Sequence, residues 1–199
     1  HVLADLMTDM MFATSHYQQT LFSSLLEART VHGGNHEVAE DLERKPLSYN
    51  TLITRSLAIA NALKNISEAG EHVGVLLPNT TKTLCVVLGL QIHGRIPAML
   101  NYSIGSAGMI SACQTALIKT VLTSRRFIEM AKLTDDAEAL SQQVNLVYLE
   151  DIAMQISVVD KLKALVQSAT ADYWYDHTQY SPDSAAVVLF TSGSEGAPK

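Results

Sequence analysis

The chain has 199 residues, of which 47% are hydrophobic and 17% charged, and its formal net charge is −6 at pH 7. This composition predicts a globular protein with a substantial core and excludes a disordered chain. The negative charge, without a local basic cluster, argues against a nucleic-acid-binding protein. No apolar run approaches eighteen residues, so the sequence predicts no membrane-spanning helix.

The first predicted elements are two helices. A methionine-rich apolar stripe with helical spacing lies in residues 1–15. We interpret residues 1–18 as a linker or junction from an upstream domain, ahead of a domain that spans 19–199. Thr20 is then expected to open a second helix, which the glycine pair at 33–34 closes.

A hairpin and an amphipathic helix are expected next. Residues 37–49 have the pattern of a short hairpin that turns near 44–46. Apolar residues recur on one helical face over 52–66, and Gly70 is a natural end for that helix.

From residue 73 onward, short apolar strands alternate with helices. Strands are predicted at 73–77, 96–100, 120–123, 146–149 and 187–190, and helices at 80–94, 109–116, 125–140 and 151–169. This alternation predicts a doubly wound α/β fold, a mainly parallel sheet with helices on both faces. Pro97 is expected at the start of its strand or on an edge, because proline has no N–H to donate to a neighbouring strand.

Two other features favour structural interpretations. Cys85 and Cys113 are 28 residues apart without metal-type spacing, and we expect buried free thiols in reducing surroundings. The aromatic segment 172–177 is interpreted as a surface connection whose rings anchor a loop rather than stack on bases.

The last fifteen residues carry the strongest chemical signal. The apolar run 185–190 leads directly into Thr-Ser-Gly-Ser-Glu-Gly-Ala-Pro-Lys. Glycines expose backbone N–H groups, and hydroxyls and a lysine add donors, a set that suits a polyphosphate. A Walker A loop is excluded because Pro198 stands where the second glycine should be. Ligands of parallel α/β sheets bind at the carboxyl ends of the strands, where this segment is expected.

A second motif is weaker. His36 and Asp41 form the His-x-x-x-x-Asp pattern of glycerolipid acyltransferases, in which histidine acts as a general base. Three carboxylates crowd this segment, and no glycine-rich or basic sequence nearby could hold a phosphate. The other histidines lack the i, i+4 spacing of a metal-binding helix.

Residues 191–199 resemble the phosphate-binding signature of the adenylate-forming superfamily, which includes acyl-CoA synthetases, peptide-synthetase adenylation domains and luciferases. The resemblance implies the N-terminal part of the adenylate-forming fold, with ATP and Mg²⁺ as cofactors. It also implies that one set of residues cradles the β- and γ-phosphates: Thr191, Ser192, Gly193, Ser194, Glu195, Gly196 and Lys199.

A longer resemblance is more specific. The segments 73–79, 89–102, 110–113 and 119–125 are similar to the acyl-acyl carrier protein synthetase part of bifunctional bacterial 2-acylglycerophosphoethanolamine acyltransferases. It implies that a fatty acid becomes an acyl-adenylate and passes to the thiol of acyl carrier protein (or of CoA). The acyl group would then reach a lysophospholipid through the upstream domain. The parent protein would lie on the cytoplasmic side of the bacterial inner membrane, whereas this fragment would be soluble.

The same resemblance implies that several parts lie beyond residue 199. They are the adenine-binding segment, a Mg²⁺-associated glutamate, the hinge, a C-terminal lysine and most of the fatty-acid pocket. We therefore expect no catalytic residue and no metal ligand in this chain, no activity for the chain alone, and a mobile loop at 191–199. Three alternatives stay open: an acyl-CoA synthetase of another specificity, a non-catalytic nucleotide- or phosphate-binding module, and an acyltransferase using His36 and Asp41.

Overall fold

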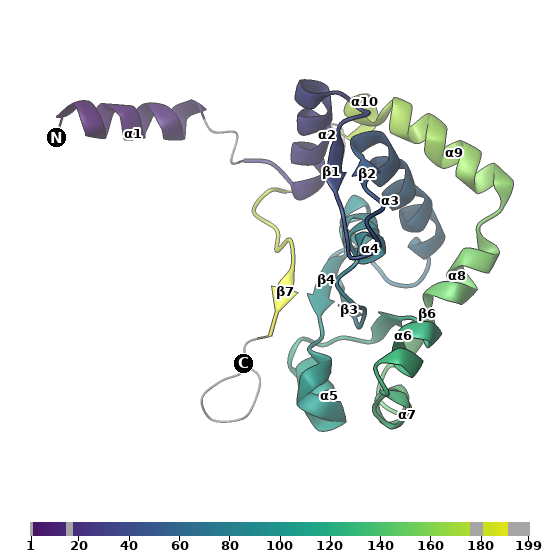
Figure 1. Cartoon of the computed structure of the whole chain (residues 1–199). Coiled ribbons are helices and arrows are strands. Elements are labelled where there is room, and N and C mark those ends of the chain that lie inside the picture. The colour runs from purple at the N-terminus through teal and green to yellow at the C-terminus, as the bar shows by residue number, and fades with distance from the viewer. Residues whose placement is uncertain (1, 15–17, 176–180, 191–199) are drawn as a thin grey trace.

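The structure is a computed structural model that describes residues 2–14, 18–175 and 181–190. Its centre is a five-stranded parallel sheet with strand order β6-β5-β3-β4-β7 (Figure 1). The strands are β3 (His72–Val75), β4 (Ile96–Met99), β5 (Thr120–Thr123), β6 (Asn145–Tyr148) and β7 (Val188–Leu189). All four pairings are parallel, as the alternating strand and helix pattern predicts.

Helices cover both faces of the sheet. One face packs against α3 (Tyr49–Leu63), α4 (Thr81–Ile92) and α8 (Leu149–Gln155). The other packs against α5 (Gly105–Thr115), α6 (Arg125–Met130) and α7 (Thr134–Ser141). Val73 and Val75 point to the first face and Leu76 to the second, so residues of one buried segment contribute to the hydrophobic cores on both faces of the sheet. The predicted doubly wound fold is confirmed.

The elements before the sheet follow the predicted order. α1 (Val2–Thr14) stands apart from the rest of the described structure, and α2 (Leu21–His32) begins at the N-cap Thr20 and ends at Gly33 (Figure 1). The hairpin β1 (Glu37–Ala39) and β2 (Leu47–Ser48) is antiparallel. Of the described helices, none is both long and apolar enough to cross a bilayer.

Two predicted long helices are each divided. The expected helix 125–140 breaks into α6 and α7 where Lys132 takes a left-handed conformation with φ 55°. The expected helix 151–169 breaks into α8 and α9 (Val158–Ala169), because Ser157 forms a capping box with Asp160 that starts a new helix. Apolar spacing continues across both breaks, so hydrophobic periodicity alone does not reveal them.

Smaller differences concern element ends. α3 ends at Leu63, before the expected Ile66, and Gly70 lies in the following turn with φ 82°. α5 begins at Gly105, four residues before the predicted start. Leu149 opens α8 instead of ending the fourth strand.

Pro97 lies inside the sheet, not at the start of its strand or on an edge strand. β4 has neighbours on both sides, β3 and β7. The N–H groups of Ile96 and Leu100 donate to β3 and its flanking residue, so the nitrogen of Pro97 faces the β7 side. β7 pairs only from Ala98 onward. The missing N–H therefore costs no ladder hydrogen bond.

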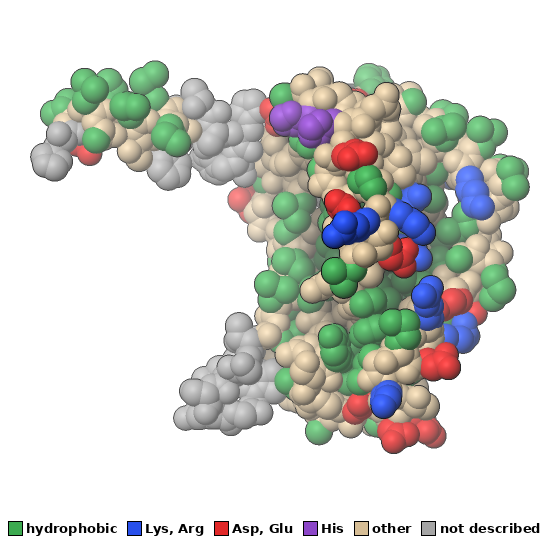
Figure 2. Space-filling model, viewed as in Figure 1, with side chains coloured by type: hydrophobic (Ala, Val, Ile, Leu, Met, Phe, Trp, Pro, Cys, Tyr) green, Lys and Arg blue, Asp and Glu red, His purple; other side chains and the backbone are tan. Residues whose placement is uncertain are grey.

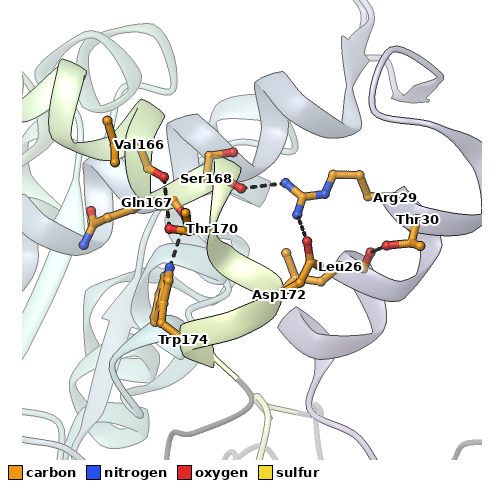
Figure 3. A network of polar contacts seen from close by, with 9 residues as sticks. All are labelled: Leu26, Arg29, Thr30, Val166, Gln167, Ser168, Thr170, Asp172 and Trp174. Carbon is orange, nitrogen blue, oxygen red and sulfur yellow. Dashed lines mark hydrogen bonds and ion pairs between the residues drawn. The ribbon is translucent and has the colours of Figure 1, made fainter.

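The aromatic segment is a short helix and not a surface connection. α10 (Ala171–Tyr175) buries Tyr175, whose ring packs edge-on against Phe22 with centroids 4.8 Å apart. Trp174 Nε1 donates to the carbonyl of Gln167 at 3.0 Å (Figure 3). Both rings anchor chain segments, as expected, while residues 176–177 of the predicted connection lie outside the described residues.

The two cysteines are free and buried, as predicted. Burial raises the pKa of each thiol to about 11, because an apolar interior disfavours the thiolate. Neither thiol is therefore activated as a nucleophile.

Candidate phosphate-binding site at the carboxyl edge of the sheet

The direction of β7 places the end of the described chain at the carboxyl edge of the sheet. Val188 pairs with Ala98 and Leu189 with Met99, both in parallel register. Phe190, the next residue, packs partly buried against the core on the α5 side. The chain therefore leaves β7 at the edge where parallel α/β sheets bind ligands.

The predicted phosphate-binding residues themselves lie outside the described residues. They are Thr191, Ser192, Gly193, Ser194, Glu195, Gly196 and Lys199. Their arrangement, their contact with phosphates and the mobility expected for this loop all stay predictions. What the structure does describe is the surface next to which this segment begins.

Two strand ends at this edge carry polar caps. Asn101, two residues after β4, accepts the N–H of Ser103 at 3.0 Å through Oδ1 and caps the short helix η1 (Tyr102–Ile104). Thr80, which follows β3, accepts the N–H of Thr83 at 3.3 Å and caps α4. Each side chain satisfies a backbone N–H that has no partner within its helix.

A groove of about 570 Å³ lies between the hairpin and the start of α4. Met99, the last residue of β4, forms part of its lining, together with Leu84 and Val87 of α4. Met99 also pairs with Leu189 of β7, so the groove and β7 both contact β4 at this residue. Glu40, Asp41 and three threonines also line it, so the groove offers both apolar and polar contacts.

Asp41 fixes the hairpin to this groove. Its Oδ2 accepts the N–H of Thr81 at 3.0 Å and the hydroxyl of Thr81 at 2.9 Å, and its Oδ1 accepts the N–H of Glu43 at 3.0 Å. These hydrogen bonds, led by that from the Thr81 backbone, lower the pKa of the Asp41 carboxyl. The carboxylate also lies at the N-terminus of α4, where the helix dipole favours negative charge.

The ends of β5 and β6 are joined by a second polar cluster. The Ser124 hydroxyl donates to Glu150 Oε1 at 2.7 Å, and Arg125 forms a two-bond ion pair with Asp151 at 2.7 and 2.8 Å. The Arg125 guanidinium also lies 4.2 Å from the ring centroid of Tyr148. Burial acts to raise the pKa of Glu150, but hydrogen bonds from Ser124 and nearby backbone N–H groups outweigh it, and the pKa is lowered. These charged groups hold two strand ends together.

The weaker motif does not assemble as a dyad. The ring of His36 lies against His32 and Tyr49, with centroids 5.6 and 6.1 Å away. Both Asp41 oxygens are engaged by Thr81 and Glu43, and within the described ranges no hydrogen bond joins His36 to Asp41. The carboxylate that would orient the histidine base serves as an anchor for α4 instead.

Sequence reasoning missed this anchor. Asp41 and Thr81 are 40 positions apart, and no local pattern links them. The available signal was the Asn79-Thr80-Thr81 start of a helix, whose free N–H groups need acceptors.

The fold is that of an α/β protein with the N-terminal architecture of the adenylate-forming enzymes. Residues 26–199 match the family described as AMP-binding enzyme, and the chain belongs to that family. This match confirms that the chain is part of an adenylate-forming domain, while the role of residues 191–199 stays a prediction.

Individual relatives are more distant. The chain is 29% identical over 173 residues to the acetyl-coenzyme A synthetase of Methylocella silvestris, covering 79% of this chain and 26% of that protein. It is 22% identical over 153 residues to 4-coumarate–CoA ligase 2 of Petroselinum crispum, covering 76% and 26%. The structure of VinN with 3-methylaspartate superposes with a TM-score of 0.69 and 22% identity, over 92% of this chain and 46% of that one. This chain thus spans about a quarter of the length of these two curated relatives.

Proposed function

We propose that the chain forms the N-terminal, phosphate-binding part of a ligase that uses ATP to activate a carboxylic acid as an acyl-adenylate and passes the acyl group to a thiol. The observation that supports this proposal is the parallel pairing of β7 with β4, because the described chain then ends after Phe190 at the carboxyl edge of the sheet. Family membership supports it, because the match extends through residue 199.

In this proposal the terminal segment binds the β- and γ-phosphates of ATP. Backbone N–H groups at Gly193 and Gly196, the hydroxyls of Thr191, Ser192 and Ser194, the backbone of Glu195 and the ammonium of Lys199 provide the donors. Mg²⁺ would neutralise part of the triphosphate charge. Among the described residues, no group of three His, Cys, Asp or Glu side chains could hold a metal ion.

A more specific part of the proposal concerns the substrates and the cellular location of the full-length protein. We infer a fatty acid as the carboxylic acid, acyl carrier protein (or CoA) as the thiol acceptor, and a lysophospholipid as the final acceptor through an upstream domain. The supporting observation is the resemblance over residues 73–125. Residues 1–18 would then be the junction and 19–199 the N-terminal subdomain. The exposed Leu3 and Leu6 of α1 are consistent with a junction helix that packs on another domain. The parent protein would work on the cytoplasmic side of the bacterial inner membrane.

The first prediction tests phosphate binding by ATP–pyrophosphate exchange with the full-length protein and a fatty acid. Gly193→Val combined with Lys199→Ala should reduce exchange by at least about a hundredfold, since donors to developing charge are lost. The control is Lys45→Ala, which removes an 81% exposed lysine that lies 3.7 Å from Glu43 on the hairpin. Normal exchange in the double variant would refute the assignment.

The acceptor is tested separately by thioester formation. Radiolabelled fatty acid and ATP are supplied with either acyl carrier protein or CoA, and the labelled product is identified. Acyl-carrier-protein thioester would support the finer proposal, whereas acyl-CoA alone would favour an acyl-CoA synthetase. Nucleotide binding without either product would favour a non-catalytic module.

A further inference from the structure

The helix α9 places its most apolar side in solvent. Five residues of α9 form an apolar stripe at helical spacing and are between 56% and 81% exposed: Val158, Val159, Leu162, Leu165 and Val166. We call these five side chains the α9 stripe. Hydrophobic side chains are visible along the outer surface of this region in Figure 2.

The opposite side of α9 holds the helix in place. Ala164 and Ser168 are buried, and Gln167 Oε1 accepts the side-chain N–H of Asn61 from α3 at 2.7 Å. Arg29 of α2 donates to the carbonyl of Ser168 at 2.7 Å (Figure 3). α9 is therefore fixed to α2 and α3 by small and polar groups, and its orientation is set by these contacts.

Charge is arranged around the α9 stripe in a regular way. At 3.6 residues per turn, Lys161 and Lys163 fall on the two opposite borders of the stripe, and both are exposed. Asp160 falls on the far side of the helix, where its carboxylate accepts the N–H of Ser157 at 2.9 Å and its hydroxyl at 2.7 Å. No carboxylate interrupts the stripe, and both of its borders are positive.

We propose that the α9 stripe docks on the surface of an anionic phospholipid bilayer, with the helix lying parallel to that surface. Apolar side chains would enter the boundary between headgroups and acyl chains, while the lysines extend their stems and place their ammonium groups among lipid phosphates. Because a lysine lies on each border of the stripe, both can reach phosphates when the helix lies flat on an anionic bilayer surface. The net charge of −6 makes long-range attraction weak, so burial of the stripe must supply much of the binding.

Vesicle flotation with the full-length protein tests this proposal. The vesicles are phosphatidylcholine alone or with about a third phosphatidylglycerol, a composition that gives an anionic surface. The protein should float with both and more strongly with the anionic vesicles. Leu162→Gln combined with Leu165→Gln should weaken partitioning at least tenfold. Lys161→Gln and Lys163→Gln should each weaken it about fivefold on anionic vesicles only.

The controls separate docking from general stickiness and misfolding. Val31→Gln on α2 and Met130→Gln on α6 remove equally apolar side chains, each 71% exposed, outside the stripe and should not change flotation. Thermal unfolding should be the same for all variants, since every substituted side chain is exposed.

Three results would overturn the proposal. The first is a wild-type protein that does not float, and the second is equal flotation of the Leu162/Leu165 double variant. The third is sedimentation equilibrium without lipid in which the wild type self-associates and the double variant does not. That result would make the stripe an interface between copies. Adenylation activity enters none of these measurements, so the test is independent of the proposed function.

Discussion

Asp41 shows how one carboxylate can serve structure where its sequence pattern indicates catalysis. Asp41 lies four residues after Glu37, the first residue of β1. Its carboxylate accepts three hydrogen bonds, two of them from Thr81. The charged form is the better acceptor, so the pKa of Asp41 is lower in the folded chain than its ordinary value of 3.8. This difference links the stability of the fold to pH.

We predict that Asp41→Asn flattens the acid end of the stability curve. Because the pKa of Asp41 is lowered by folding, its contribution is fully present above the unfolded pKa and is lost as pH falls through the folded pKa. Urea midpoints measured from about pH 6 down to about pH 2.5 should therefore fall more steeply for the wild type than for Asp41→Asn.

The matched control for Asp41 is Glu40→Gln. The Glu40 carboxylate has no hydrogen bond to any other residue that the structure describes, although it lines the same groove. Its substitution should leave the acid part of the curve as steep as in the wild type. Equal curves for Asp41→Asn and wild type would show that the bonds to Thr81 do not stabilise the folded state.

At the scale of elements, Arg29 joins three helices. One guanidinium nitrogen donates to the carbonyl of Ser168 near the end of α9, and another pairs with Asp172 of α10 at 2.5 Å (Figure 3). The Arg29 side chain is only 11% exposed, so these bonds are partly shielded from water, although Asp172 itself is 53% exposed. Arginine suits this position because its planar guanidinium group can donate hydrogen bonds to two acceptors at once.

We predict that Arg29→Ala lowers the free energy of unfolding by about 1.5–3 kcal/mol, the usual range for hydrogen bonds of a charged group. Urea denaturation followed by circular dichroism measures this. Lys45→Ala removes the exposed pair with Glu43 and should change stability by less than about 0.5 kcal/mol. Arg29→Lys should recover only part of the loss. If Arg29→Ala were as stable as the wild type, the three helices would be held by apolar packing alone.

Element identity was more predictable than element ends or orientation. The strand 120–123 was predicted with its observed bounds because a compact apolar run is flanked by clear breaks. The division between α8 and α9 was missed although Ser157 and Asp160 form a capping box that is visible in the sequence. The outward orientation of the α9 stripe could not be predicted. Periodicity locates an apolar face but does not say whether the chain covers it.

At the scale of the whole molecule, topology was predictable and the site only in part. The alternation of strands and helices predicts a parallel sheet, which the structure has. In a parallel sheet, ligands bind at the carboxyl ends of the strands, so the ligand-binding edge is predicted as well. The groove bounded by Asp41 and Met99 depends on residues that are far apart in the sequence and meet only in the folded chain. The assignment of residues 191–199 as the phosphate-binding segment rests on resemblance and stays a prediction.

The same topology separates two surfaces that one experiment can distinguish. β7 pairs with β4 at one end of the described sheet, whereas α9 packs on α2 and α3 and contributes no residue to the groove by Met99. We predict that amide hydrogen exchange of the full-length protein slows in residues 188–199 when ATP and Mg²⁺ are added, while α9 is unchanged. Anionic vesicles should slow exchange in α9 and leave 188–199 unchanged. Slowing of both segments by either ligand would mean that the two surfaces are coupled and would contradict their independence.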